Sequence, residues 1–273
     1  MNPSLSKEEL ERYQRQMQLP GVGLDGQLKL KNASVLVVGA GGLGCPALIY
    51  LAEAGIGTIG IADHDLVAVS NLHRQPLFHH HDVGQGKALI AAQRLRELNP
   101  HVLIHTHTEG LLPKNAVEIV DAYDVVLDCT DRFDARYLIN DVCVLLNKPF
   151  IHGSLLRHQG QLAVFNRKIS DAERSATYRC VFPKPPAPSE TSDCIVAGIF
   201  GFLPGLIGSW MAGEAIKLLL DFPFEPTLLL LDAQGNTLQK MSLLSNPKNG
   251  AHAPKTASEI LHFDYGVFCS GLT

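Results

Sequence analysis

The chain has 273 residues, of which 46% are hydrophobic and 18% are charged, and its formal net charge is −4. This composition excludes intrinsic disorder, collagen and coiled coil as the main class, and nothing in the charge favours a nucleic-acid-binding protein. The length fits one large domain, and we predict that residues 1–273 form a single one.

Strand and helix patterns alternate along the first half of the chain. Residues 7–17 and 24–32 have helical spacing, and an apolar run rich in β-branched residues follows at 34–39. Such runs are typical of strands buried on both faces of a sheet. Further strands are predicted at 58–63, 102–107, 124–130 and 149–153, and helices at 43–54, 86–98, 114–121 and 133–146. This order predicts an α/β fold, a Rossmann-like doubly wound and mainly parallel sheet.

The pattern changes after Gly153. Residues 155–166 alternate as in a β-hairpin, and the proline-rich segment 182–193 is expected to be a crossover loop between the two halves. An apolar helix is predicted at 198–220 and a second hairpin at 227–243. We therefore expect antiparallel strands in the C-terminal half of the sheet.

Several features bear on the compartment. The first fifteen residues are polar and lack the apolar segment of a secretion signal. The six cysteines form no CxxC pair and are expected to be reduced thiols. The uncharged stretch 195–213 barely reaches the length of a membrane span, but it contains five glycines and a proline. We therefore expect a cytoplasmic protein in which this stretch is a core or subunit-interface helix. The three histidines at 79–81 are expected to lie on a solvated loop.

A glycine-rich loop lies between the first predicted strand and the following helix. Gly39, Gly41 and Gly44 have GxGxxG spacing, which lets backbone N–H groups approach a phosphate at a helix N-terminus. Asp63 ends the next strand, where its carboxylate can accept hydrogen bonds from ribose hydroxyls. These residues predict a nucleotide site, but they do not separate a dinucleotide from ATP, so an NAD(P)-dependent oxidoreductase stays open here.

Polar side chains follow the ends of the second and fourth strands. Asn71, Arg74 and Gln75 lie in one loop, Lys87 is near the start of a helix, and Asp131 comes just past the fourth strand. Because the carboxyl ends of parallel strands face one crevice, these residues should meet at the glycine loop. Hydride transfer needs no such cations around phosphates, whereas phosphoryl or nucleotidyl transfer does. The set therefore favours transfer from a nucleoside triphosphate.

Together the motifs resemble the ThiF/HesA/MoeB family, the bacterial relatives of ubiquitin-activating enzymes. The resemblance covers roughly residues 10–245. Besides the glycine loop, the motifs that carry it are RYQRQ (12–16), SNLHRQ (70–75), DVGQGKA (82–88), DCTD (128–131), GQLAVF (160–165), YRC (178–180) and AGIFGFLPGLIGSWMAGEAIKLL (197–219). Family members use ATP and Mg²⁺ to adenylate the C-terminal glycine of a small ubiquitin-like sulfur carrier. The resemblance implies that activity here, with release of pyrophosphate.

The resemblance also implies a role for each matching residue. The nucleotide phosphates would be cradled or contacted by Gly39, Gly41, Gly42, Gly44, Asn71, Arg74 and Lys87. Asp63 would bind the ribose, Gln75 would line the same site, and Asp131 would bind Mg²⁺. Arg15 would be supplied to the partner subunit's site, which makes a homodimer part of the function. Cys194 occupies the position of the family's sulfur-handling cysteine, although a bystander thiol fits the sequence equally well.

The sequence departs from the family in two places. Many members hold a structural zinc with two CxxC pairs, but here the first pair is reduced to Thr177 and Cys180, and KNGAHA (248–253) stands where the second is expected. Cys180 and His252 offer at most two ligands where four are needed, so we expect no structural zinc and a looser C-terminal lobe. Arg132 stands where asparagine is common and adds a cation beside the metal site.

The resemblance divides the domain into parts and names partners. The parts are the N-terminal helices at 1–33, a nucleotide-binding half at 34–153, a carrier-binding and dimer half at 154–245, and a tail at 246–273. The expected partners are a small ubiquitin-like sulfur carrier ending in Gly-Gly, a separate sulfur donor, because no rhodanese domain follows, and a second copy of the chain. Neither nucleic acid nor a membrane is expected. The pathway stays open among molybdopterin, thiamin, tRNA thiolation and secondary metabolism.

Three other functions remain possible at this point: an NAD(P)-dependent Rossmann oxidoreductase, a relative that adenylates a peptide or an RNA-linked group, and a non-catalytic scaffold. Carrier-dependent exchange between ATP and pyrophosphate would distinguish the adenylyltransferase from all three.

Overall fold

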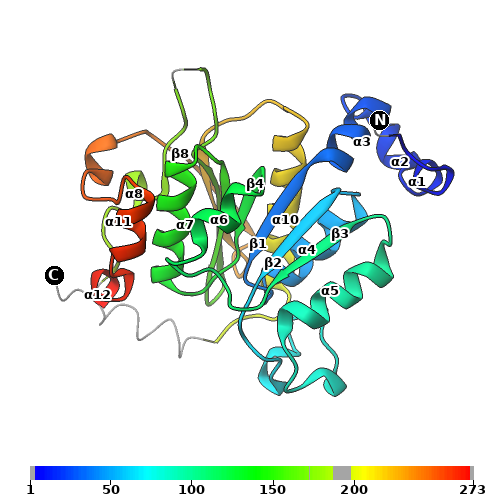
Figure 1. Cartoon of the computed structure of the whole chain (residues 1–273), viewed down its shortest axis with the longest axis horizontal. Helices are drawn as coiled ribbons and strands as arrows, with labels where there is room; N and C mark the ends of the chain where they lie inside the picture. Colours follow the sequence, from blue (N-terminus) through cyan, green and yellow to red (C-terminus); the bar gives the residue numbers. More distant parts are fainter. Residues whose placement is uncertain (1–3, 172, 187–197, 271–273) are drawn as a thin grey trace.

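The computed structural model describes residues 4–171, 173–186 and 198–270. They form an eight-stranded sheet with the order β3-β2-β1-β4-β5-β6-β7-β8 and with helices on both faces (Figure 1). The strands are β1 (Ser34–Val38), β2 (Thr58–Ala62), β3 (Leu103–His107), β4 (Val125–Asp128), β5 (Phe150–Leu156), β6 (Gln159–Phe165), β7 (Thr227–Asp232) and β8 (Thr237–Ser242). The predicted doubly wound α/β fold is confirmed.

The helices fall close to their predicted positions, with two exceptions. The segment 7–17 divides into two short helices, and the apolar helix predicted at 198–220 begins only at Leu203. Those of the N-terminal half are α1 (Lys7–Arg12), α2 (Gln14–Met17), α3 (Gly23–Asn32), α4 (Gly44–Glu53), η1 (Val69–Asn71), η2 (His80–Asp82), α5 (Lys87–Leu98), α6 (Ala116–Asp121) and α7 (Phe133–Leu145). Those of the C-terminal half are α8 (Tyr178–Val181), α10 (Leu203–Leu219), η3 (Pro247–Gly250), α11 (Ala257–His262) and α12 (Tyr265–Ser270).

Strands β1 to β5 are parallel, and their central members are buried on both faces. Val35 pairs with Ile59 of β2 and with Val125 of β4, and all three side chains are fully buried. Each such side chain stabilises the fold by roughly 1.5–3 kcal/mol relative to an exposed one. Continuous apolar runs are therefore required here, as the sequence indicated. One core cluster packs under α4, α5 and α10, and a second packs under α6, α7 and α8.

The C-terminal half of the sheet is antiparallel, as predicted. β5 and β6 form a hairpin whose turn places Arg157 at φ 56°, and β7 and β8 form a second hairpin with Asn236 at φ 52°. β6 also pairs with β7, so the two hairpins extend the same sheet. The carboxyl ends of β1, β2 and β4 remain together at one edge, where the predicted nucleotide residues lie.

The C-terminal tail forms ordered structure against the body of the protein. α11 and α12 pack on α7, with Ile260 and Tyr265 buried. These two side chains complete the core cluster on that face of the sheet. The expectation of a looser C-terminal lobe stays a prediction.

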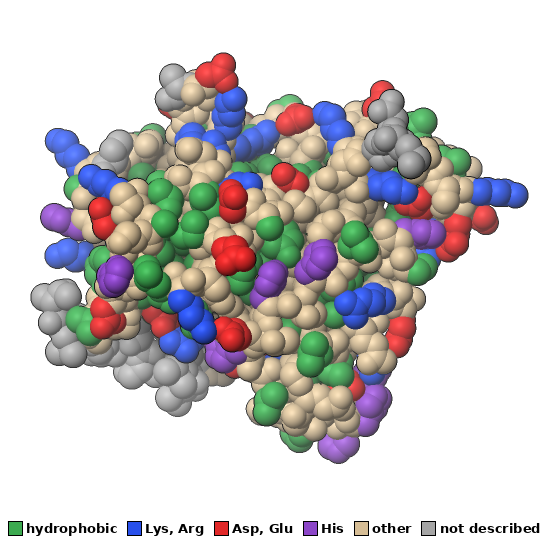
Figure 2. All heavy atoms as spheres, viewed as in Figure 1, with side chains coloured by type: hydrophobic (Ala, Val, Ile, Leu, Met, Phe, Trp, Pro, Cys, Tyr) green, Lys and Arg blue, Asp and Glu red, His purple; other side chains and the backbone are tan. Residues whose placement is uncertain are grey.

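Two further features are the distribution of charge on the surface and the length of the apolar helix. Figure 2 shows acidic and basic side chains interspersed over the face of the molecule that it draws. α10 spans 17 residues. Within residues 4–171, 173–186 and 198–270, the helices are all too short or too polar to cross a membrane.

Candidate nucleotide site at the carboxyl ends of the parallel strands

The glycine loop joins β1 to α4 with its backbone closely packed. Gly39 has φ +94°, and a Cβ there would lie 2.8 Å from the carbonyl oxygen of Cys129. A Cβ on Gly44 would lie 1.9 Å from the carbonyl oxygen of Gly39. These two glycines are therefore required by the turn itself. At Gly41 a Cβ would meet Nε2 of Gln75 at 3.5 Å, an ordinary contact, so the turn does not need a glycine there.

Asp63, just past β2, holds the glycine loop from one side. Its Oδ2 accepts a hydrogen bond from the backbone N–H of Ala40 at 2.6 Å, and its Oδ1 accepts one from the N–H of Asp65 at 2.8 Å. Burial raises the pKa of the Asp63 carboxyl, and the two backbone N–H groups offset part of that effect. Asp63 therefore shapes the glycine loop through both of its carboxylate oxygens.

The loop after β2 brings its polar residues to the glycines. The carbonyl oxygen of Asn71 accepts hydrogen bonds from the N–H groups of Arg74 and Gln75, at 3.0 and 3.1 Å. A Cβ on Gly42 would lie 3.6 Å from Cδ of Arg74. Gln75 is 3% exposed, and its Oε1 has no hydrogen-bond partner among the described residues. The buried amide of Gln75 therefore lies beside Gly41 and carries an acceptor that no described group satisfies.

Lys87, the first residue of α5, is buried and paired. Its side chain is 6% exposed, and Nζ donates to Oδ2 of Asp65 at 2.8 Å. Burial alone would raise the pKa of the Asp65 carboxyl, but the hydrogen bond and charge of Lys87 hold it below its usual value. Asp65 received no role in the analysis of the motifs, although its position two residues after Asp63, in the same polar loop, was the available signal.

Asp131 lies beyond β4. Two residues before it, Cys129 packs its backbone against Gly39 of the glycine loop. Asp131 is exposed, and no hydrogen bond or ion pair within the described ranges engages its carboxylate. Arg132, the unexplained departure from the family, forms a fork with the Asp134 carboxylate, including a 3.0 Å bond from Nε to Oδ1. The added cation is therefore largely matched by an anion two residues along the chain.

These contacts bring together most of the predicted nucleotide residues. Comparison with known proteins then shows the family to which the chain belongs. The ThiF family matches residues 13–253. The chain belongs to the ThiF family. The resemblance inferred from the motifs is confirmed.

Two relatives illustrate the extent of the similarity within the ThiF family. The chain is 47% identical over 266 residues to the sulfur carrier protein adenylyltransferase of Thermus thermophilus, covering 97% of this chain and 98% of the relative. It is 42% identical over 273 residues to the adenylyltransferase and sulfurtransferase MOCS3 of Drosophila sechellia. That match covers 98% of this chain but only 59% of the relative, so the chain spans little more than half of MOCS3.

Solved structures with the same fold include MccB of Escherichia coli in complex with MccA-N7isoASN. The TM-score is 0.73 at 21% identity, over 86% of this chain and 73% of MccB. At this identity the likeness concerns the fold, and it agrees with the sheet described above.

Two further residues that the ThiF resemblance implies are Arg15 and Cys194. Arg15 lies on α2 and is exposed, and no hydrogen bond or ion pair in the described part of the chain engages its side chain. Cys194 lies outside the described residues. The structure therefore brings together the glycines, Asp63, the loop after β2 and Lys87, but it does not bring Arg15 to them within one chain.

The histidine loop of this ThiF-family chain is linked to α5 by an arginine. Nη2 of Arg94 lies 3.1 Å from Nδ1 of His79, 3.2 Å from Nε2 of His81 and 3.5 Å from Oδ2 of Asp82. The ligand atoms of these three residues lie within 4.8 Å of one another. The cation among them is the guanidinium of Arg94. His79 and His81 are exposed, as expected of a solvated loop.

Proposed function

We propose that this chain is an ATP-dependent adenylyltransferase that activates the C-terminal glycine of a small ubiquitin-like sulfur carrier ending in Gly-Gly. The observation that carries the proposal is the convergence of the glycine loop, Asp63, Arg74 and Lys87 at the carboxyl ends of β1 and β2. The names of the relatives, above all the full-length match from Thermus thermophilus, support the same activity and the same class of substrate.

The proposed reaction needs charge stabilisation more than proton transfer. A carboxylate oxygen of the carrier attacks the α-phosphorus of ATP and forms an acyl–phosphate bond, while the bond from that phosphorus to the bridging oxygen breaks and pyrophosphate leaves. The carboxylate is already ionised at neutral pH, so no general base is required. Arg74 and Lys87 would neutralise charge that develops on the phosphates. Asp63 would hold the ribose, and Asn71 and Gln75 would line the same site.

Mg²⁺ is the metal expected with ATP, and Asp131 fits it. An exposed carboxylate that no other described group engages is a suitable oxygen ligand for a hard cation. Asp131 would hold the ion, whose positive charge would offset the negative charge of the phosphates. Asp65, already paired with Lys87, would instead keep that ammonium group directed at the site.

The other functions considered from the sequence have less support. An NAD(P)-dependent oxidoreductase is not favoured by membership of the ThiF family. A peptide substrate is the partner in solved structures of MccB, but at 21% identity this likeness concerns the fold.

None of the five described cysteines pairs with another, which supports a reducing, cytoplasmic setting.

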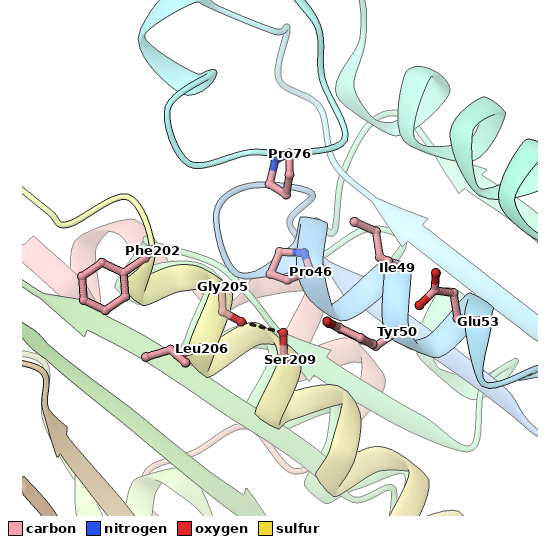
Figure 3. Close-up of a pocket in the computed structure, with 9 residues that line it drawn as sticks. All are labelled: Pro46, Ile49, Tyr50, Glu53, Pro76, Phe202, Gly205, Leu206 and Ser209. Atoms are coloured by element: carbon pink, nitrogen blue, oxygen red, sulfur yellow. Dashed lines mark hydrogen bonds between the residues drawn. The ribbon is translucent and has the colours of Figure 1, made fainter. Parts of the chain in front are cut away.

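The working unit is proposed to be a homodimer formed through α4 and α10. A groove of about 650 Å³ lies between these helices, and Figure 3 shows Tyr50, Phe202 and Leu206 at its rim. These three side chains are 50%, 55% and 50% exposed. A second copy that covers them would remove apolar surface from water. Leu206→Glu should dissociate the dimer in sedimentation experiments, whereas Leu244→Glu, at a residue 79% exposed, should not.

Exchange between ATP and labelled pyrophosphate tests the enzymatic proposal. Exchange should require a carrier with an intact Gly-Gly end and should stop when its last glycine is removed. Lys87→Ala should lower the rate by about 10²-fold or more, because it removes a positioned cation. Lys114→Ala is the matched control, since this lysine pairs with Glu109 on the surface. Silence with every carrier, together with an NADH-dependent absorbance change, would contradict the proposal.

A further inference from the structure

Asp128 and His152 form a buried pair beneath the loop that carries Asp131. They are direct neighbours in the parallel pairing of β4 with β5, at the carboxyl end of β4. Nδ1 of His152 lies 2.7 Å from Oδ2 of Asp128, and the two side chains are 1% and 0% exposed. A charged carboxylate in such a place needs its hydrogen-bonding capacity filled.

The second oxygen of the Asp128 carboxylate holds the turn that follows the strand. Oδ1 accepts hydrogen bonds from the N–H of Thr130 at 3.1 Å and from its hydroxyl at 2.6 Å. The carbonyl oxygen of Thr130 accepts a hydrogen bond from Nη2 of Arg136 on α7 at 3.1 Å. Thr130, the residue immediately before Asp131, is therefore held by Asp128 and by Arg136. Asp128 in turn is held by His152.

The charges within the pair agree with this arrangement. Burial alone would raise the pKa of the Asp128 carboxyl, but the hydrogen bond from His152 outweighs this effect, and the pKa lies below its usual value. Burial lowers the pKa of His152. At neutral pH a neutral imidazole therefore donates its Nδ1–H to an ionised carboxylate. The ring of His152 is oriented by Tyr178 and Phe165, whose centroids lie 5.0 and 6.2 Å away.

We propose that His152 is a positioning residue for the metal–nucleotide site, which acts through Asp128 and Thr130 to set the place of the Asp131 carboxylate. This inference rests on the proposed function, because it takes Asp131 as the ligand of Mg²⁺. Partners that orient a metal ligand typically contribute about 10- to 100-fold in metal affinity or activity.

Mg²⁺ titration of the carrier-dependent exchange tests the proposal. His152→Phe keeps a ring of similar size but cannot donate, and it should raise the Mg²⁺ concentration for half-maximal rate by about 10-fold or more. His152→Asn keeps a donor and should recover part of that loss. Phe150→Leu is the matched control, since this fully buried residue on the same face of β5 makes no polar contact. It should lower stability without moving the Mg²⁺ dependence.

A second variant keeps the test open if His152→Phe fails to fold. Thr130 is only partly buried, and Thr130→Val removes the hydroxyl bond to Asp128 while it keeps the shape. It should shift the Mg²⁺ dependence in the same direction, and Thr130→Ser should not.

Binding of Mn²⁺ in the presence of ATP, followed by electron paramagnetic resonance without any carrier, separates this inference from the proposed function. If the wild type binds Mn²⁺ with ATP but never exchanges pyrophosphate, the proposed function fails and the binding titration still decides the inference. Weaker Mn²⁺ binding in His152→Phe and Thr130→Val supports it. Unchanged Mn²⁺ binding and unchanged Mg²⁺ dependence in both variants, or a wild type that does not bind Mn²⁺ with ATP, would overturn it.

Discussion

The guanidinium of Arg179 and the carboxylate of Asp141 form a fork inside the protein, with Nε–Oδ1 at 2.7 Å and Nη2–Oδ2 at 2.8 Å. The side chains are 3% and 0% exposed. The hydroxyl of Tyr265 donates to the same carboxylate at 3.1 Å, and the guanidinium lies 4.8 Å from the ring centroid of Phe268. This pair joins α7 and α8 to α12, so the C-terminal tail is fastened to the body by a buried charge network.

Breaking this pair should be costly. Arg179→Met leaves a buried carboxylate without its cation, and we expect the free energy of unfolding to fall by about 3–5 kcal/mol. The double variant Arg179→Met with Asp141→Leu should lose less than the single one, since no buried charge remains. Urea unfolding of both variants checks this. Equal losses in the single and double variants would show that packing, not charge, dominates at this place.

The C-terminal lobe should hold its structure without zinc. Sγ of Cys180 lies 3.3 Å from Oγ1 of Thr177 and belongs to the cap of α8, and the sequence provides too few further ligands for a structural site. Metal analysis of the purified protein should find zinc far below one ion per chain, and a chelator should leave the thermal unfolding midpoint unchanged. Stoichiometric zinc, with a midpoint that falls on chelation, would refute this prediction.

The sequence predicted the parallel half of the fold well, because buried strands must be apolar along their whole length. Val35 and the residues paired with it are fully buried, so each of these positions needs an apolar side chain. It also placed the glycines, Asp63 and Lys87 at one edge of the sheet, since parallel strands bring their carboxyl ends together. The tail was less predictable. It is joined to the body where Tyr265 meets Asp141, and these residues lie 124 positions apart and share no local periodicity.

His152 was overlooked for a related reason. A histidine inside an apolar strand is itself a signal, because a buried polar group needs a partner. Its partner, Asp128, begins the DCTD motif, but only the pairing of β4 with β5 places the two side chains together. Local pattern therefore indicates that a partner exists, and tertiary pairing decides which residue it is.

Two alanine substitutions in the glycine loop should affect different properties, one the stability of the protein and the other its binding of ATP. Gly44→Ala places a Cβ within 1.9 Å of a carbonyl oxygen, so we expect a loss of more than about 4 kcal/mol in stability. Gly41→Ala meets only an ordinary contact, so the protein should fold normally. Its methyl group would occupy space at the phosphates, and the KM for ATP should rise. Unfolding curves and exchange kinetics measure both effects. Normal ATP kinetics in Gly41→Ala would argue against phosphate binding at this turn.

The N-terminal helices should loosen in acid. Oε2 of Glu9 accepts hydrogen bonds from Nζ of Lys31 at 2.7 Å and from the N–H of Ser6 at 2.8 Å. Burial alone would raise the pKa of Glu9, but these partners hold it below the usual value. A carboxyl with a lowered pKa in the folded state stabilises above its unfolded pKa of about 4.3, and this contribution disappears as the pH falls through the folded pKa.

Glu9→Gln should therefore lower stability at about pH 7, and should lower it by less at about pH 3, because the wild-type carboxyl takes up a proton as the pH falls through its lowered pKa. Denaturant unfolding at the two pH values measures the difference. A deficit of the same size at both values would assign the role of Glu9 to packing instead of charge.

Arg15 and Lys87 allow a decisive test of a site shared between two subunits. Arg15 is exposed on α2, while Lys87 is buried beside Asp65, and each single variant, Arg15→Ala or Lys87→Ala, should be nearly inactive in exchange but folded. If Arg15 acts in the partner's site, a mixed dimer contains one site with both residues and one with neither. Subunits mixed in equal amounts and allowed to re-associate should then recover about a quarter of the wild-type rate, because half of the dimers are mixed and each has one working site. If Arg15 acts within its own chain, every site in the mixture lacks one residue and no activity returns. Full activity of Arg15→Ala on its own would remove the arginine from the mechanism altogether.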